Sequence, residues 1–227
     1  MSLDLYAKIE PLIGFDDAYE ELYDVYMQYI EELNSSTILD VGCGSGKLLS
    51  RLKGFNAVGV DLSLEMVKRS KEKGLDARHI DICKLDEQYD TILCVADVLN
   101  YMNGSELQNF LQCIVERLKP NGYFIADINT LYGFENVAEG TMLRSLEDKF
   151  FSVDAEFNDF ILESEFTLFE LNSDGSYTKE QSTIFQYFYT EETIKELTPL
   201  EFVSKENVTL FGDEPDKTLM IFRKGLK

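Results

Sequence analysis

Three glycines that alternate with other residues follow a short apolar strand, and this pattern is typical of a ligand cradle. The run Ile38–Gly46 holds them as Gly42, Gly44 and Gly46, and a stretch with helical character follows. Glycine lets the backbone bend sharply and approach a bound molecule, because it has no Cβ. In open parallel sheets, ligands bind beyond the carboxyl ends of the strands. The run therefore predicts a ligand site at the end of a strand.

The spacing of these glycines argues against two common phosphate-binding loops. A dinucleotide fingerprint, G-x-G-x-x-G, would need its third glycine where the sequence has Lys47. A P-loop would need a glycine at Val41 and a hydroxyl side chain at Leu48. Asp40 also places negative charge beside the loop, which opposes a pyrophosphate. The loop favours a ligand that presents no phosphate to it.

The run Leu39–Gly46 resembles the first motif of the class I S-adenosylmethionine-dependent methyltransferases, and the next segment continues the match. Val58–Ser63 is similar to the end of the second strand in that family. The resemblance implies that Asp61 accepts hydrogen bonds from both ribose hydroxyls of the cofactor. Asp61 lies 19 residues after Gly42, a spacing that suits the ribose-binding acid of dinucleotide folds equally well. By itself, this acid leaves the choice of cofactor open.

Three later segments extend the resemblance in the family's order. His79–Ile82 is similar to the segment that approaches the adenine, and it implies that Asp81 faces the adenine amino group while Ile82 supplies apolar and backbone contact. Tyr89–Tyr101 resembles the fourth strand and the loop beside the methionine part of the cofactor. Leu118–Asp127 resembles the helix end, turn and fifth strand. The match covers residues 36–130, and its order makes it specific.

The resemblance implies three groups of site residues. Those expected to bind S-adenosylmethionine are Asp40, Gly42, Cys43, Gly44, Gly46, Asp61, Leu62, Met66, Asp81, Ile82, Ala96, Asp97, Tyr6 and Tyr19. Those expected to orient the acceptor or take its proton are Asp97, Asn100 and Tyr101, although Asp97 and Asn100 are equally suited to contacting only the cofactor or capping a turn. Those expected to face the substrate are drawn from Asn129, Phe166, Gln186, Tyr187 and Tyr189.

Apolar runs that alternate with helical patterns predict an α/β fold with a doubly wound, mostly parallel sheet. The strands are expected at Thr37–Val41, Ala57–Val60, Thr91–Val95 and Tyr123–Asp127, and the helices at Asp16–Leu33, Leu64–Lys73 and Glu106–Leu118. Ser63 and Ser105 are expected to cap two of these helices, and only Ser105 is followed by a residue, Gln108, that completes a capping box. The first helix is expected either to pack beside the sheet or, with Tyr6–Phe15, to close over the cofactor.

The chain changes character over residues 141–189, which are rich in Phe, Tyr, Ile and Thr. Asp174-Gly175 is a hairpin signal there, so an antiparallel β-layer is expected as an insertion after the fifth strand. A helix is expected from Thr190, and Phe202–Leu210 with Leu219–Arg223 are expected to close the fold as an antiparallel pair. We predict a single domain over residues 1–227, with a lid helix over 1–34, a cofactor-binding core over 36–130, the insertion over 141–189 and closing elements over 190–227.

Composition limits the classes of partner and compartment. The formal net charge is −21, so DNA and RNA would be repelled. The four cysteines form no C-x-x-C pair and lie mainly in apolar stretches, which favours small buried side chains and a reducing cytoplasm. Neither a leader nor a membrane span is expected. The only histidine, His79, has no second histidine or cysteine cluster near it, so no metal site is expected.

The sequence therefore predicts a cytoplasmic methyltransferase that uses S-adenosylmethionine and moves a methyl group to nitrogen or oxygen of a small-molecule acceptor by in-line displacement. Two alternatives stay open: a non-catalytic module that binds the same cofactor, and an NAD(P)-dependent oxidoreductase. The acceptor, the methylated atom, any catalytic base and the oligomeric state are not specified by these patterns.

Overall fold

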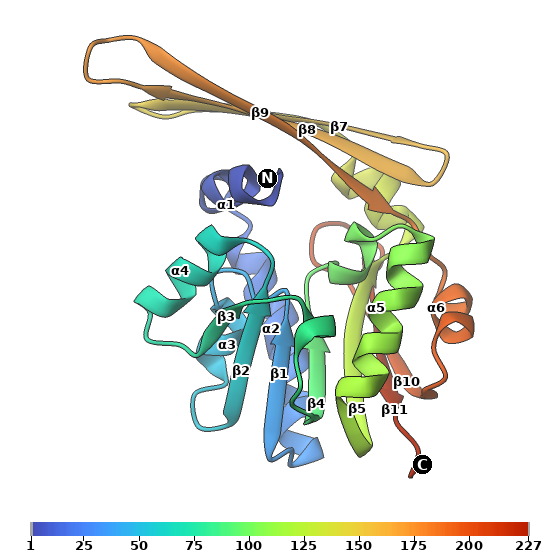
Figure 1. Ribbon diagram of the computed structural model, residues 1–227. Coiled ribbons are helices and arrows are strands. Elements are labelled where there is room, and N and C mark those ends of the chain that lie inside the picture. The colour runs from blue at the N-terminus through green and yellow to red at the C-terminus, as the bar shows by residue number, and fades with distance from the viewer. Residues whose placement is uncertain (1, 227) are drawn as a thin grey trace.

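The computed structural model describes residues 2–226, which form two β-sheets and the helices around them (Figure 1). The larger sheet has seven strands in the order β10-β11-β5-β4-β1-β2-β3. Its strands are β1 Thr37–Val41, β2 Asn56–Asp61, β3 Ala77–His79, β4 Tyr89–Cys94, β5 Leu118–Asn129, β10 Glu201–Val208 and β11 Lys217–Arg223. Strands β1 to β5 pair in parallel, whereas β11 is antiparallel to both β5 and β10. The predicted sheet and its closing strand pair are confirmed.

Helices cover both faces of this sheet, because successive residues of a strand point to opposite faces. In β1, Leu39 packs in the same cluster as Leu111 and Ile194, whereas its neighbour Ile38 packs with Ile30 and Val67. The helices concerned are α2 Asp16–Leu33, α3 Lys47–Arg51, α4 Leu64–Glu72, α5 Gly104–Arg117 and α6 Glu191–Leu197. The doubly wound arrangement is confirmed, and α2 has the predicted bounds.

The second sheet has four antiparallel strands in the order β6-β7-β8-β9 and lies across the end of the core to which the parallel strands point (Figure 1). Its strands are β6 Gly140–Ser145, β7 Lys149–Asn158, β8 Ile161–Leu171 and β9 Tyr177–Tyr187. Helix α1, Ser2–Ile13, packs beneath it through Leu5 and Ile9, which join the cluster of Phe151, Phe166 and Ile184. The inserted β-layer is confirmed, and Asp174-Gly175 lies in the turn between β8 and β9.

Short helical turns complete the chain at η1 Ile82–Lys84, η2 Val98–Tyr101 and η3 Gly133–Ala138. Of the two predicted helix caps, Ser63 is confirmed, because its hydroxyl accepts from Met66 N at 3.3 Å. The helix expected from Thr190 is α6, and Thr190 is its N-cap. The cap predicted at Ser105 is wrong. Asn103 caps α5 instead, and Glu106 completes the capping box by accepting from Asn103 N at 3.0 Å.

The cysteines divide into one pair and two buried thiols. Cys83 and Cys113 form a disulfide, because α5 packs on η1 and brings their Cα atoms to 5.1 Å. Cys43 and Cys94 are free and buried. The expectation of small buried side chains holds for Cys43, Cys94 and Cys113, whereas Cys83 is only partly buried. The disulfide is not what the expected reducing compartment favours. Among residues 2–226, no helix is long and apolar enough to cross a membrane.

Candidate cofactor and active site

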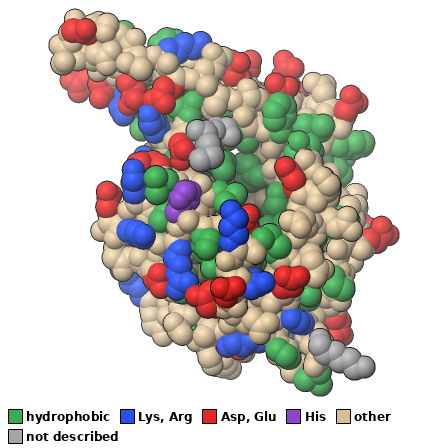
Figure 2. All heavy atoms as spheres, viewed as in Figure 1, with side chains coloured by type: hydrophobic (Ala, Val, Ile, Leu, Met, Phe, Trp, Pro, Cys, Tyr) green, Lys and Arg blue, Asp and Glu red, His purple; other side chains and the backbone are tan. Residues whose placement is uncertain are grey.

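A cavity of about 530 Å³ opens where the parallel strands end, between the core and the overhanging four-stranded sheet. Its walls come from α1, α2, the glycine loop, the end of β2, residues 80–82, the segment from 95 to 110, and β9. On the face shown in Figure 2, hydrophobic side chains gather beneath the overhanging sheet. The site is therefore built from elements far apart in the sequence.

The glycine loop bends into the cavity through positive φ angles at Gly42, Gly44 and Gly46. Its start is tied to β2, because Gly42 N and Cys43 N both donate to the carbonyl oxygen of Val60, at 2.8 and 3.1 Å. A Cβ added at Gly44 would meet no atom within 4 Å. The backbone of Gly44 thus borders open space, as a cradle for a closely approaching ligand requires.

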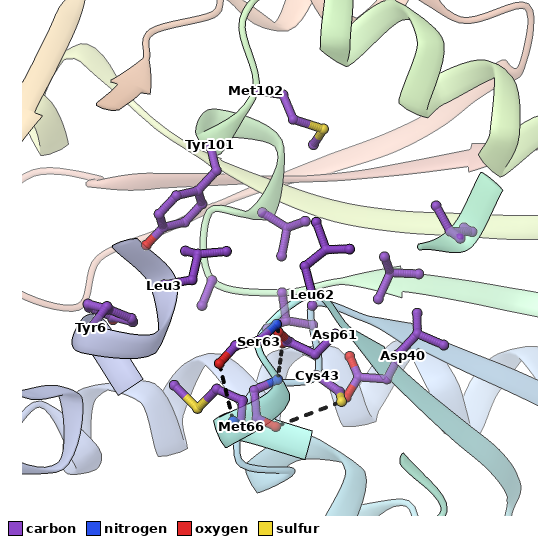
Figure 3. Close-up of a pocket in the computed structure, with 18 of the residues that line it drawn as sticks. Leu3, Tyr6, Asp40, Cys43, Asp61, Leu62, Ser63, Met66, Tyr101 and Met102 are labelled. Atoms are coloured by element: carbon purple, nitrogen blue, oxygen red, sulfur yellow. Dashed lines mark hydrogen bonds between the residues drawn. The ribbon is translucent and has the colours of Figure 1, made fainter. Parts of the chain in front are cut away.

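Asp61 fixes the shape of this cradle from the neighbouring strand. Its Oδ2 accepts from Gly44 N at 2.8 Å, and its Oδ1 accepts from Ser63 N at 2.7 Å. Figure 3 shows its side chain between Ser63 and the Cys43 end of the glycine loop. Burial raises the pKa of Asp61, and the backbone hydrogen bonds from Ser63 and Gly44 oppose that shift. The carboxylate therefore holds two backbone segments while it borders the cavity.

Asp40 presents a buried oxygen that no other described group satisfies. Its side chain lines the cavity, and Oδ2 has no hydrogen-bond partner. Burial and the nearby charge of Asp61 raise the pKa of Asp40 to about 7. A buried unsatisfied carboxylate oxygen is costly, and a positively charged ligand group would relieve that cost.

The far side of the cavity is mainly apolar. Ile80, Ile82, Met102 and Phe110 line it. Asp81 lines it too, while its Oδ1 accepts from Cys83 N at 2.9 Å and caps η1. A flat aromatic ligand group would find apolar surface there and a carboxylate oxygen at its edge.

The predicted lid residues, Tyr6 of α1 and Tyr19 of α2, both line the cavity. The side chains of Tyr6 and Tyr101 lie close to each other, which brings α1 beside η2. Figure 3 shows the Tyr101 hydroxyl directed toward α1. Burial raises the pKa of all three tyrosines, so their hydroxyls stay neutral. The amino-terminal helices and η2 together close one side of the site.

Several predicted site residues lie outside the cavity lining. Asn100 is fully buried, donates to Tyr187 O at 2.8 Å and accepts from Asn129 N at 3.0 Å, so its amide is used within the fold. Tyr189 donates to Met102 O at 2.7 Å. The lining also omits Gly46, Asp97, Asn129, Phe166 and Gln186, but it includes Cys43, Leu62, Met66, Ala96, Tyr101 and Tyr187.

Asp97 and Asn129 belong instead to a buried charge cluster, which we define as Lys217, Asp97, Asp127 and Asn129. The Lys217 ammonium contacts Asp97 Oδ1 and donates to Asn129 Oδ1 at 2.9 Å. Asp127 accepts from Ala96 N at 2.8 Å and Asp97 N at 3.1 Å, and these two residues have positive φ. The cluster holds the strained loop between β4 and η2 in place, so Asp97 stabilises the wall of the cavity without lining it.

Three lining residues on β9, Thr183, Ile184 and Phe185, were not singled out from the sequence. They belong to an edge strand that crosses the cavity. Alternation along β9 shows which side chains share a face, but it does not show that the strand's edge meets the core. Met102 and Phe110 were also missed, because they read as ordinary apolar residues beside and within α5.

Known proteins share this sequence pattern and fold. Residues 38–122 match a family model described as a methyltransferase domain. The chain is 30% identical over 142 residues to "Putative methyltransferase YqeM" of Bacillus subtilis, an alignment that covers 55% of this chain and 58% of that protein. It is 26% identical over 219 residues to "Putative methyltransferase GWCH70_2453" of Geobacillus sp., covering 89% and 88%.

Solved structures match over most of the chain. An S-adenosylmethionine-dependent methyltransferase from Clostridium acetobutylicum superposes with a TM-score of 0.77 at 24% identity, covering 91% of this chain and 92% of that one. The sugar N-methyltransferase KedS8 from Streptoalloteichus sp. gives a TM-score of 0.72 at 17% identity, covering 89% and 86%. At these identities the likeness establishes the fold.

The fold and the glycine cradle define a Rossmann-like α/β domain with a cofactor site at the ends of its parallel strands. The match over residues 38–122 and the shared fold make the chain similar to the class I S-adenosylmethionine-dependent methyltransferases, whose cofactor is S-adenosylmethionine. The residues present fit this cofactor. The open space at Gly44 admits a closely packed group, and the unsatisfied oxygen of Asp40 suits a cation.

Replacing Lys217 with methionine is expected to lower the free energy of unfolding by about 3–5 kcal/mol, because Asp97 and Asp127 would keep buried charge without a cation. Urea denaturation measures this loss. Lys119→Met is the matched control, since its ion pair with Asp90 at 3.0 Å is about one-third exposed and is expected to contribute only about 0–1 kcal/mol. Equal losses in the two variants would contradict the role of the buried charge cluster.

The raised pKa of Asp40 predicts a pH dependence of stability. The folded-state pKa of about 7 lies above the ordinary value of 3.8, so this group's contribution is fully present below pH 3.8 and is lost as pH rises through 7. In denaturant titrations of the cofactor-free proteins, the free energy of unfolding of the wild type is expected to fall by about 2–3 kcal/mol relative to that of Asp40→Asn between pH 5 and pH 8. A pH-independent difference would show that Asp40 titrates normally.

Proposed function

We propose that this protein transfers the methyl group of S-adenosylmethionine to nitrogen or oxygen of a small-molecule acceptor by in-line displacement. The observation that carries the proposal is that the cavity continues past the glycine cradle, where Tyr6, Tyr101 and Ile184 form its walls. The cradle would accommodate the cofactor, and α1 and β9 contribute walls to the remaining space. A concave space of this kind suits a small molecule better than a polymer.

The names of related proteins support an acceptor of this size. KedS8 is described as a sugar N-methyltransferase, and CalS10 of Micromonospora echinaspora, with a TM-score of 0.69 at 17% identity, as an amino pentose methyltransferase. A Rickettsia canadensis relative, 28% identical over 122 residues, is named as a ubiquinone biosynthesis O-methyltransferase. Both nitrogen and oxygen acceptors therefore occur among proteins similar to this chain.

The bound cofactor would supply a methyl group already activated on a positively charged sulfur. What this chain must then do is align the acceptor and exclude water. Tyr6 and Tyr101 join α1 to η2 across the cavity, and β9 covers it from above. Alignment and solvent exclusion of this kind supply about 7–11 kcal/mol of a barrier in favourable cases. Asp61 and Asp81 would hold the ribose and adenine ends of the cofactor, and Asp40 its cationic group.

Two measurements test the proposal. Calorimetric titration with S-adenosylmethionine is expected to show one site per chain. Incubation of the protein with S-adenosylmethionine and a panel of small amines and alcohols is expected to yield methylated products by mass spectrometry. Cofactor binding without methylation of any panel member would refute the small-molecule proposal and favour a module that only binds the cofactor.

A further inference from the structure

The part of the cavity beyond the glycine cradle, which we call the acceptor chamber, has a restricted chemistry. It is lined by Tyr6, Tyr19, Tyr101, Thr183, Ile184, Phe185 and Tyr187. The polar groups of these side chains are hydroxyls, and those of Tyr6 and Tyr101 lie close to each other. The burial that raises the pKa of Tyr6, Tyr19 and Tyr101 keeps these hydroxyls from acting as proton acceptors near neutral pH.

The basic groups near the chamber have partners, whereas Asp40, whose Oδ2 has none, lies beside the glycine loop at the cofactor end of the cavity. Glu106 accepts from Asn103 N at 3.0 Å. Glu10 of α1 accepts from Lys47 Nζ in an ion pair. Asp97, behind η2, is held by the Lys217 ammonium. The only histidine, His79, is exposed, and its Nε2 is 3.0 Å from Leu62 O. Among the described residues, none of the acceptor-chamber side chains is positioned as a general base.

We propose that the acceptor is an amine, which this chamber methylates on nitrogen without a protein base; this rests on the proposed function above. In the step, the amine lone pair forms the new N–C bond while the S–C bond of the sulfonium breaks and leaves its electron pair on sulfur. The product ammonium then releases its proton to solvent. An alcohol would instead have to lose its proton during bond formation, a transfer for which a positioned base typically contributes 10²–10⁴-fold.

The charges of the cavity favour the same class of acceptor. Five carboxylate residues line it against one lysine: Glu10, Asp40, Asp61, Asp81 and Glu106 against Lys47. This excess attracts cations and opposes a carboxylate as the methyl acceptor. An amine in neutral water is largely in its ammonium form. The negative potential of these carboxylates therefore raises the concentration of an amine acceptor near the cavity and lowers that of an anion.

A second cavity continues this acidic surface onto the open face of the sheet. Glu156, Asp159 and Glu163 line it, and it shares Phe185 and Tyr187 with the first cavity. Carboxylates beside aromatic rings attract an ammonium group through charge and through the faces of the rings. The shared side chains make this surface an approach to the acceptor chamber.

The test compares acceptors that share a carbon skeleton and differ in whether they offer an amine, an alcohol or a carboxylate. Benzylamine, benzyl alcohol and phenylacetate form one set, and glucosamine, glucose and glucuronate a second. Methyl transfer from isotopically labelled S-adenosylmethionine is expected to show kcat/KM at least about 100-fold higher for an amine than for its alcohol. Methylation of an alcohol or a carboxylate at an equal or higher rate overturns the amine inference and leaves the proposed function standing. Methylation of no member, with the cofactor bound, overturns the proposed function itself.

The pH profile gives an independent result. Without a protein base, log(kcat/KM) is expected to rise with a slope of one up to the pKa of the amine in solution, so the break should move when a less basic fluorinated amine is used. A break that stays at one pH for both amines would reveal a base on the protein and overturn the inference. Tyr101→Phe is expected to lower kcat/KM through lost positioning but to leave the slope unchanged.

The approach surface is tested with matched acids on β8. Glu163→Gln is expected to lower kcat/KM for the amine about two- to fivefold at low salt and to have no effect at high salt, because steering by charge is screened. Glu165→Gln is the control, since Glu165 is also exposed on β8 but lines neither cavity. Equal effects of the two variants would show that the acidic approach plays no part in capturing the acceptor.

Discussion

Replacing Gly44 with alanine is expected to weaken the binding of S-adenosylmethionine by at least about 100-fold, equivalent to about 2.7 kcal/mol, while the protein stays folded. The added Cβ would meet no protein atom within 4 Å, so it would project into the space reserved for the ligand. The φ of +53° at Gly44 adds strain of about 1–2 kcal/mol to the folded state. Calorimetry measures the binding loss, and thermal unfolding without cofactor measures the strain.

Gly46→Ala is the matched control in the same loop. A Cβ there would lie 2.5 Å from both Leu75 Cδ1 and Ser70 Oγ, at a φ of +79°. This substitution is expected to destabilise the fold by about 2–4 kcal/mol through overpacking and backbone strain. The substitution at Gly44 should therefore mainly lower cofactor affinity, whereas the substitution at Gly46 should mainly lower the stability of the fold. Normal cofactor affinity in Gly44→Ala would contradict the cradle.

Asp61→Asn is expected to raise the dissociation constant for S-adenosylmethionine by about 100-fold. The amide would place N–H donors against Gly44 N or Ser63 N, where the carboxylate now accepts at 2.8 and 2.7 Å. Hydrogen bonds to charged groups contribute about 1.5–3 kcal/mol each, so the substitution should weaken both the loop and the proposed contact with the ribose. Calorimetric titration of the variant beside the wild type measures the change.

Asp76→Asn is the control for this change, because its carboxylate is more than half exposed and pairs only weakly with Arg78, at 3.6 Å. Cofactor affinity in that variant should match the wild type. If the dissociation constant of Asp61→Asn for S-adenosylmethionine were within threefold of the wild-type value, Asp61 would not contribute to cofactor binding.

Much of the core could be predicted because its signals are local. The apolar strand before Gly42, the helical spacing from 16 to 33 and the turn at Asp174-Gly175 each depend on neighbours in the sequence. Ser63 was found as a cap for the same reason. The cap at Asn103 was missed because Ser105, two residues later, offered a hydroxyl with Gln108 at the spacing of a capping box.

The remainder depends on contacts that no local pattern carries. Lys217 meets Asp97 across 120 residues of sequence, and nothing near Lys217 marks it as buried. Asn100 has the residue type of an acceptor ligand, yet its amide joins β9 to β5. Cys83 and Cys113 pair only because α5 returns over η1. Which residues line the cavity and which only support it depends on these long-range contacts, so the sequence could not distinguish them.

The edge strand β9 limits how this protein could be re-engineered. Strand β9 is the last strand of the four-stranded sheet, it lines the cavity, and it leads into α6. A sheet transplanted from a relative would therefore replace the residues that β9 contributes to the cavity wall. Chimeras that exchange residues 140–187 as a block should therefore inherit the donor's choice of acceptor while they keep the recipient's affinity for S-adenosylmethionine.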